Sequence, residues 1–264
     1  MKKIIFVMFA LLMVANEALA YNPYGHQSTV LLANKYLSEN AKKECAAILK
    51  NSSMVKEAVW LNTLRKNPEM AHSKEWHFFR LDKNGKSTTM YENDGVVVLE
   101  KAIAVLRDRK NQSDSLVNAS LRTVIHLVAD LHCISHIHID EVPESKGFLF
   151  YHWNELEGKG SREWKAQWYT LWNNSYFTRY KVFPIDYHAE DIDIHCKAKR
   201  AEYEKGTPRF WVENMGEDVV RALKDFPMGQ NVPTNILQRY EYNHVKCVAK
   251  AAYRLAALLN DIFK

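Results

Sequence analysis

The chain has 264 residues, of which 47% are hydrophobic and 25% are charged, and its formal net charge is +5. Together with a mean hydropathy of −0.37, these values describe an ordinary globular protein with enough chain to bury a large core. Nine glycines and seven prolines argue against a turn-dense all-β fold, and the sequence has no repeats and no glycine-rich phosphate loop. The mild positive charge favours anionic ligands.

The first twenty residues have the pattern of a secretory signal peptide. Two lysines precede the apolar run Ile4–Ala15, which is too short to span a membrane, and an Ala-Leu-Ala ending follows at Ala20. We therefore predict residues 1–20 as a signal peptide, cleavage before Tyr21, and a single domain over residues 21–264. The mature chain is expected in the periplasm or outside the cell.

Helical periodicity dominates the rest of the chain, and no convincing run of alternating strand residues appears. The spacing predicts an all-α fold, a multi-helix bundle with long functional loops. Residues 147–150 and 183–194 fit no element clearly. The predicted helices are Ser28–Lys50, Val55–Asn67, Gly95–Arg109, Ser115–Ile137, Gly160–Phe177, Arg209–Lys224 and Asn243–Phe263.

The cysteine count fits an exported protein. The chain contains Cys45, Cys133, Cys196 and Cys247. An even number in an oxidising compartment predicts disulfides, and three pairings are open. Cys133 lies beside the histidines described next, so a structural thiol, a disulfide and a metal ligand are all open for it.

The stretch from His126 to His136 places polar residues on a predicted apolar helix. At about 100° per residue, Asp130 lies about 40° from His126, and His136 lies about 80° to its other side. A single histidine on such a face is usually a hydrogen-bonded core residue. Three ionisable groups there are costly to bury without partners, and imidazole with carboxylate suits Zn²⁺. The stretch therefore predicts a metal site.

Three further histidines lie outside this stretch. His26 comes five residues after the predicted N-terminus, His77 lies in a Trp-His-Phe-Phe segment, and His152 lies in a second aromatic segment. Each of them alone is more typical of a capping or packed histidine. Together with the central helix, they supply the ligands for a cluster of zinc ions.

These positions resemble the class I zinc-dependent nucleases, the three-zinc single-strand nucleases and 3′-nucleotidases whose fold is similar to zinc phospholipase C. Signal cleavage in that family exposes an aromatic residue, and a histidine follows five residues later, as His26 follows Tyr21. The family motif His-x-x-x-Asp-x-His-Gln-Pro-Leu-His matches residues 126–136 at every ligand position. Further family elements resemble residues 60–62, 211–214 and 254–260.

The resemblance implies up to three zinc ions and a phosphodiesterase mechanism. A water held between two of the ions becomes hydroxide near neutral pH and attacks phosphorus, while the third ion stabilises the leaving group. Aromatic residues near the cluster would stack a base, which requires a single-stranded substrate. The implied ligands are His77, His126, Asp130 and Asn62 for one ion; His136, His152 and Glu155 for a second; and the Tyr21 amino and carbonyl groups with His26 and bridging Asp130 for the third.

The chain departs from the family pattern inside this cluster. Asn62 replaces an aspartate, and a neutral amide binds zinc more weakly than a carboxylate. Leu156 replaces another aspartate, for which the neighbouring Glu155 is the candidate substitute. Arg80 stands where the family has an aspartate thought to assist the attacking water. Asp130 and Arg80 are therefore the candidate catalytic residues, and the sequence assigns no substrate-binding residue.

The residues and the family resemblance leave three functions open. The first is a zinc-dependent nuclease or 3′-nucleotidase that acts on single-stranded nucleic acid or nucleotides. The second is a related phosphoesterase that acts on another substrate, such as a phospholipid. The third is a catalytically inactive descendant that keeps part of the zinc cluster. For all three we expect a monomer without a membrane span and without a stable protein partner.

Overall fold

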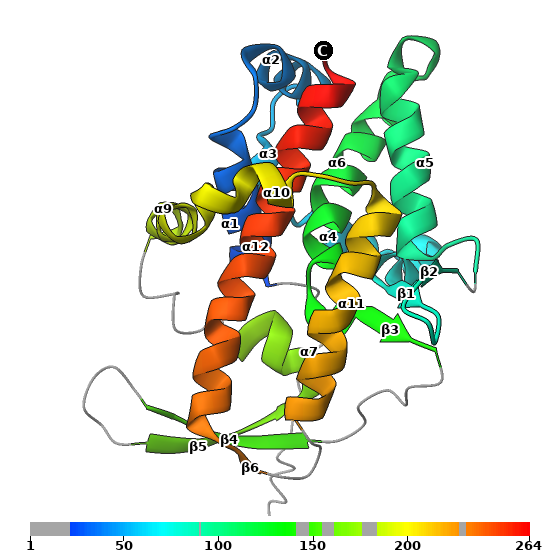
Figure 1. Cartoon of the computed structure of the whole chain (residues 1–264). Coiled ribbons are helices and arrows are strands. Elements are labelled where there is room, and N and C mark those ends of the chain that lie inside the picture. The colour runs from blue at the N-terminus through cyan, green and yellow to red at the C-terminus, as the bar shows by residue number, and fades with distance from the viewer. Residues whose placement is uncertain (1–21, 90, 141–147, 155–160, 176–183, 227–230) are drawn as a thin grey trace, which may run out of the picture.

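Long helices form the core of the computed structural model, which describes residues 22–89, 91–140, 148–154, 161–175, 184–226 and 231–264 (Figure 1). The predicted all-α class is confirmed. Its longer helices are α1 (Pro23–Asn34), α2 (Glu39–Leu49), α5 (Gly95–Arg107), α6 (Asp114–Leu131), α9 (Ile185–Cys196), α11 (Pro208–Asp225) and α12 (Thr234–Ile262).

Shorter helical elements connect these helices and turn the chain. They are α3 (Met54–Glu57), α4 (Trp60–Leu64), α7 (Trp168–Thr170) and α10 (Arg200–Tyr203), together with the tighter turns η1 (Pro68–His77), η2 (Arg109–Asn111), η3 (Ile134–His136) and η5 (Lys197–Lys199) and the π-helical turn η4 (Leu171–Ser175). Among the described helices, none is long and apolar enough to cross a membrane.

Helix α6 occupies the centre of the bundle, where it packs against α1, α5 and α12 (Figure 1). Its first turn is capped by the Ser113 side chain, which accepts a hydrogen bond from the Leu116 backbone N–H. From Thr123 to Leu131 every residue of the helix is buried. Polar side chains in this half of α6 therefore have only protein groups or bound ligands as partners.

A small sheet brings two distant histidines close together. Strand β1 (Phe79–Leu81) pairs with β2 (Ser87–Thr88) and runs parallel to β3 (Ile137–Ile139), with Phe79 opposite Ile137. Because η1 ends at His77 and η3 ends at His136, each histidine comes just before one of the two parallel strands. The register of this sheet therefore fixes their relative position.

A second small sheet corrects the prediction that Gly160–Phe177 is a helix. Strand β5 (Ser161–Gln167) pairs antiparallel with β4 (Phe148–Asn154), which also pairs parallel with β6 (Asn231–Val232). Only residues 168–175 of that segment are helical, and its ends lie outside the described residues. The strand forms because it pairs with the preceding strand β4, and helical periodicity carries no information about such pairing.

Two other predicted helices are broken by local signals. Ser28–Lys50 divides into α1 and α2 because the Ser38 side chain accepts from the Ala41 backbone N–H and starts a new helix. Ser115–Ile137 ends as a helix at Leu131, so His136 is not on α6 as its predicted angle required. Elsewhere Val55–Asn67 becomes α3 and α4, residues 185–194 join α9, and α12 begins earlier than predicted.

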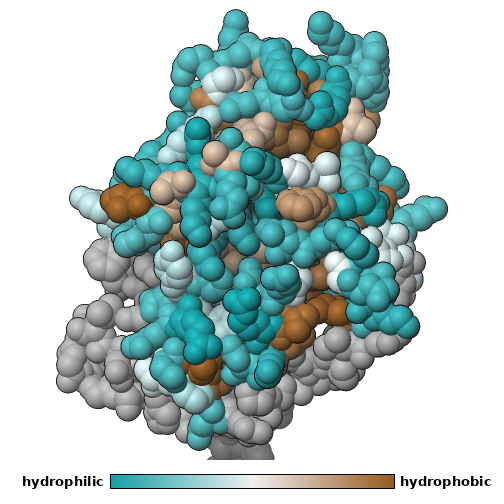
Figure 2. Space-filling view, viewed as in Figure 1, coloured by the Kyte–Doolittle hydropathy of each residue, from teal (hydrophilic) through white to brown (hydrophobic). Residues whose placement is uncertain are grey.

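The surface seen in Figure 2 is mostly hydrophilic, and its hydrophobic side chains lie in small separate groups. Tyr187 on α9 is the most exposed of the large hydrophobic residues described, at 70%. Scattered apolar residues of this kind are normal on a surface in contact with water.

Candidate metal centre

Five ionisable side chains from four elements meet inside the bundle. His26 lies on α1, His126 and Asp130 on α6, His77 at the end of η1, and His136 at the end of η3. All five side chains are fully buried. The structure thus brings together five of the predicted ligands, which are separated by up to 110 residues in the chain.

Asp130 lies at the centre of this cluster, and each of its oxygens faces two histidines. Its Oδ2 lies 2.7 Å from His77 Nδ1 and 3.1 Å from His126 Nε2. Its Oδ1 lies 3.5 Å from both His26 Nε2 and His136 Nδ1. The His26 ring stacks on the His126 ring, with centroids 4.0 Å apart. One carboxylate therefore joins the four imidazoles.

Three members of the cluster offer atoms suited to one metal ion. His26, His126 and Asp130 each present one nitrogen or oxygen, and these three atoms lie within 4.8 Å of one another. Ligand atoms around tetrahedral Zn²⁺ lie about 3.4 Å apart, as metal–ligand bonds of about 2.0–2.1 Å require. Small inward movements of these side chains would therefore complete a coordination site.

Backbone carbonyls orient two of the rings. The Nδ1 of His126 lies 2.7 Å from the carbonyl oxygen of Ala58, and donation there leaves Nε2 directed at Asp130. The Nδ1 of His136 lies 2.9 Å from the carbonyl oxygen of His77. Hydrogen bonds of this kind fix the ring and tautomer of metal-binding histidines. The chain thus holds these imidazoles in place by itself.

Several buried polar atoms of the cluster, and one on α4 where it packs against α6 and η1, lack a hydrogen-bond partner among the described residues. They include Asp130 Oδ1, His77 Nε2 and Asn62 Oδ1, and Asn62 on α4 is only 6% exposed. Leaving such atoms unpaired in a protein core is costly, and buried polar groups in native structures normally have partners. A cation is a partner that suits all three atoms, so the residues present fit a bound metal.

The charge states of the cluster also suit a cation. Burial lowers the pKa of His77 to about 4 and holds the pKa of His26 well below its usual value. Burial opposes the charged form of Asp130, but His126, His136 and His77 hold the pKa of this carboxyl well below its usual range. Neutral imidazoles beside a carboxylate are the protonation states that metal binding requires.

The remaining predicted site residues have different surroundings. Arg80 lies in β1, where its Nε is 3.7 Å from Asp94 Oδ2 and its guanidinium lies 5.9 Å from the Tyr91 ring centre. His152 lies in β4, paired in register with Glu163 of β5. Tyr21 and Glu155, the predicted ligands at the mature N-terminus and after β4, lie outside the described residues.

Three residues beside the cluster were missed in the sequence. The Tyr169 ring stacks on His136 with centroids 5.2 Å apart, and its hydroxyl hydrogen-bonds to Arg65. Asn173 Oδ1 lies 3.2 Å from His136 Nε2. Tyr169 and Asn173 are four residues apart, one helical turn, and this spacing within the predicted helix Gly160–Phe177 is a signal that could have paired them.

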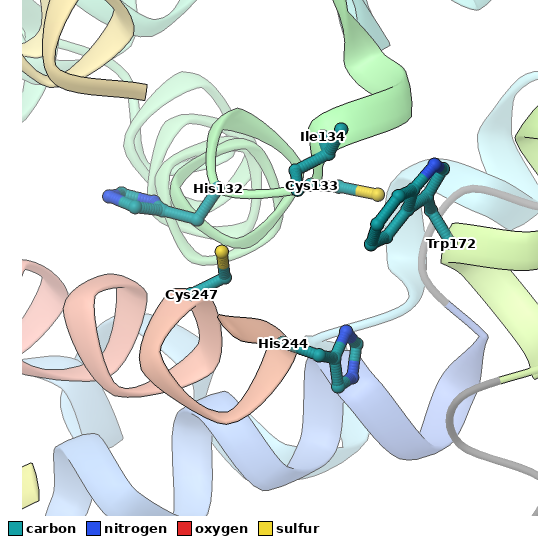
Figure 3. A pocket seen from close by; sticks show the side chains of 6 residues that line it. All are labelled: His132, Cys133, Ile134, Trp172, His244 and Cys247. Atoms are coloured by element: carbon teal, nitrogen blue, oxygen red, sulfur yellow. The ribbon is translucent and has the colours of Figure 1, made fainter. Parts of the chain in front are cut away.

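The four cysteines correct the disulfide prediction, because all are free and buried. In Figure 3 the Cys133 sulfur points toward Trp172, and Cys247 approaches from α12. Cys133 Sγ lies 3.2 Å from Asn173 Oδ1. Burial raises the pKa of both thiols, that of Cys247 to about 12, which keeps them protonated. Cys133 is thus a packed thiol beside the cluster.

Comparison with known proteins adds an independent observation. The sequence model of the family described as S1/P1 Nuclease matches residues 21–147. This stretch contains all five clustered side chains and the two parallel strands that position His77 and His136. A comparison with curated proteins finds no match.

Proposed function

The chain is a divergent member of the S1/P1 nuclease family, and from that premise we propose that it is a zinc-dependent phosphodiesterase acting on single-stranded nucleic acid. The observation that supports the proposal most strongly is the surroundings of Asp130. Its carboxylate faces four buried imidazoles, and its Oδ1 accepts no hydrogen bond from any described residue. A buried anion in such a position is the expected core of a metal site.

The chain's own residues would hold and orient the metal. His26, His126 and Asp130 are the first ligands, and His77 and Asn62 present further unpaired atoms. Bound Zn²⁺ supplies Lewis-acid polarisation of a phosphoryl oxygen and lowers the pKa of water toward neutrality. Burial lowers the pKa of His26 and His77, and the neighbouring histidines lower the pKa of Asp130, so two imidazoles are held neutral and the carboxylate ionised, as metal binding requires.

The guanidinium of Arg65, which lies near the cluster, favours a substrate that contains phosphate. Arg65 hydrogen-bonds to Tyr169, and the Tyr169 ring stacks on His136. A guanidinium held in this way favours the charge of a phosphodiester and of its developing transition state. Phe78, whose ring lies 5.5 Å from that of His136 and 6.2 Å from that of Tyr169, adds an aromatic surface for a base.

A catalytically inactive zinc-binding descendant is the second candidate. Asn62 contributes no charge to the cluster, so Asp130 is the one carboxylate among the clustered side chains described. Arg80, where the family has an acid, is engaged with Asp94. Both features weaken catalysis more than they weaken binding of one zinc ion.

The proposal includes export. Residues 1–20 carry the signal-peptide pattern, and cleavage after Ala20 would create the free amino group of Tyr21. A free α-amine has a pKa of about 7.7–8.0 and binds metal when deprotonated. Export and assembly of the third zinc site would then depend on the same cleavage.

The deciding experiment measures zinc per chain and cleavage of single-stranded DNA on the mature protein and on Asp130→Ala. We expect the wild type to hold zinc and cleave, and the variant to bind zinc at least about tenfold more weakly and lose cleavage. Asp191→Ala, at a half-exposed position on α9, is the matched control and should change neither quantity.

The outcomes separate the candidates. Zinc bound by the wild type without cleavage of DNA would favour the inactive descendant, and cleavage of a phospholipid instead of DNA would favour the related phosphoesterase. Normal zinc content in Asp130→Ala would contradict the metal centre proposed here.

A further inference from the structure

A solvent-accessible cavity lies beside the first half of α6, away from the buried cluster in its second half. Its volume is about 390 Å³. One wall is a single face of α6, and the others come from Lys50 after α2 and from Trp60 at the start of α4. We call it the α6 cavity; it is lined by Lys50, Trp60, Asp114, Ser115, Asn118, Ala119 and Arg122.

Arg122 and Trp60 form a fixed floor for this cavity. The Arg122 guanidinium lies over the Trp60 ring, 5.4 Å from its centre. Arg122 Nε lies 3.0 Å from an oxygen of Glu57, a buried carboxylate that also accepts from the Ser52 hydroxyl. This ion pair is made through Nε, and no hydrogen bond joins either terminal nitrogen to a described residue. A rigid cation with unused donors therefore borders the cavity.

Lys50 supplies a second cation from an unusual backbone. Its φ of 55° makes it the one positive-φ residue other than glycine within the described ranges. Glycine is the usual residue after a helix in such a conformation, since a side chain is strained there. The Lys50 ammonium lies 3.4 Å from Asp114, but both side chains are largely exposed, and such surface pairs stabilise little. The contacts within the protein thus do not account for a lysine at this position.

The lining selects a chemical class of ligand. Two cations from separate elements outnumber the one lining carboxylate, Asp114, and favour a phosphate, and the N-terminal end of α6 at Ser115 adds the favourable end of a helix dipole. The indole and guanidinium together offer a flat surface for an aromatic base. The volume is in the range of about 300–1,000 Å³ that is typical of small-molecule sites.

We propose that the α6 cavity binds a mononucleotide, with its phosphate held by Lys50 and Arg122 and its base lying against Trp60. That the ligand is a nucleotide, and not another aromatic phosphate, rests on the proposed function. The site is distinct from the metal centre, because Arg122 precedes His126 by one helical turn and none of the clustered side chains lines the cavity. It would retain a product nucleotide or hold one nucleotide of a bound strand.

The test is calorimetric titration of the zinc-loaded, full-length mature protein with adenosine 5′-monophosphate, which contains no internucleotide bond to cleave. We expect Lys50→Gly and Arg122→Gln each to weaken binding about tenfold. Lys50→Gly should at the same time raise the melting temperature, because glycine relieves the strained backbone. Lys56→Ala, an exposed lysine on α3 outside the cavity, is the matched control and should bind as the wild type does.

Three results would overturn the proposal. They are unchanged affinity in Lys50→Gly, loss of nucleotide binding in Asp130→Ala instead, and equal affinity for inorganic phosphate with no effect of Trp60→Leu. Tighter binding of a short single strand than of the mononucleotide, lost in the same variants, would identify the strand as the source of the nucleotide. Absence of zinc or of DNA cleavage would overturn only the proposed function, since this titration measures neither.

Discussion

Two buried histidines of the same stretch, His126 and His132, show how a histidine proposed as a metal ligand differs from a structural one. His132 has both ring nitrogens engaged: Nδ1 lies 2.7 Å from the Val128 carbonyl oxygen, and Nε2 lies 2.7 Å from Arg254 Nη1. His126 uses Nδ1 on a carbonyl but directs Nε2 at Asp130, whose other oxygen accepts no hydrogen bond among the described residues. Burial is complete for both, so the hydrogen-bond partners, not exposure, separate them.

The His132 network is satisfied by a buried cation. Arg254 on α12 donates to His132, to the Tyr203 carbonyl oxygen at 2.8 Å and to Asn214 Oδ1 at 3.0 Å, and its guanidinium lies over Trp211. Burial lowers the pKa of Arg254 to about 10, which still leaves it charged at neutral pH. Figure 3 shows the His132 ring directed away from Cys133 on the same chain segment. This region is complete without a ligand, whereas the Asp130 cluster is not.

The strongest test of the difference between the two histidines removes Arg254, the cation of the His132 network. Arg254→Met should lower the free energy of unfolding by roughly 2–4 kcal/mol, because the two buried acceptors, His132 Nε2 and the Tyr203 carbonyl oxygen, lose their donor at about 1–3 kcal/mol each, partly offset by methionine packing. Urea unfolding measures the loss. Zinc bound per folded chain should stay at the wild-type value. Arg239→Met, at an exposed arginine on the same helix, is the matched control and should change little. Loss of zinc without loss of stability would place His132 in the metal centre.

A second test uses pH on a buried histidine outside the cluster. His188 on α9 hydrogen-bonds to Ser28 and packs against Tyr24 on α1, with His244 of α12 nearby, and burial lowers its pKa to about 4. The unfolded chain, with a histidine pKa of about 6.5, binds the proton more readily. The stability that neutral His188 provides is therefore present above pH 6.5 and is lost as pH falls toward 4.

We expect the wild type to lose roughly 2–3 kcal/mol more stability than His188→Gln between pH 6.5 and 4. Denaturant unfolding at a series of pH values measures the difference between the two proteins. Parallel curves for the two proteins would mean that the pKa of His188 is the same in the folded and the unfolded chain. His195→Gln, at an exposed histidine on the same helix, should follow the wild type.

The cluster proposed as the metal centre could be predicted from the sequence only where its members are close in the chain. Asp130 follows His126 by one helical turn, and the helix between them formed as expected. The predicted position of His136 on the same helix was wrong, because α6 ends at Leu131. His136 is brought to Asp130 by η3 and the parallel strands β1 and β3. Strand pairing of this kind depends on residues about sixty positions apart and leaves no local periodicity.

The other errors also come from contacts that helical periodicity and residue counts do not show. The segment Ser161–Gln167 becomes a strand because β4 pairs with it, and sheet propensity depends on such neighbours. The disulfide prediction followed from the number of cysteines and the expected compartment, whereas pairing requires close Cα atoms, which only the fold decides. Tyr169 and Asn173 were missed because a helical aromatic run is usually core, and what they contact is set by the packing of η4 against η3.

The smallest predicted effect concerns Asn62, where the family pattern has an aspartate. It tests the Asp130 cluster, the unsatisfied side of the comparison. Asn62 Oδ1 is buried without a hydrogen-bond partner among the described residues, and its helix α4 packs against α6, so Asn62→Asp would place a second negative charge in the same interior as Asp130. Without metal, the two buried anions repel and the variant should be less stable than the wild type. With metal, the added charge should tighten zinc binding about tenfold, or about 1.4 kcal/mol.

Denaturant unfolding measures the stability of the metal-free protein, and chelator competition measures its zinc affinity. A ligand position requires lower stability together with tighter zinc binding, whereas a structural amide does not give this combination. Asn243→Asp, at a buried asparagine on α12, is the matched control, and it should lower stability with no gain in zinc affinity. If Asn62→Asp behaves like Asn243→Asp, the Asn62 oxygen lies outside the coordination sphere, and zinc binding in this chain depends on Asp130 and the histidines alone.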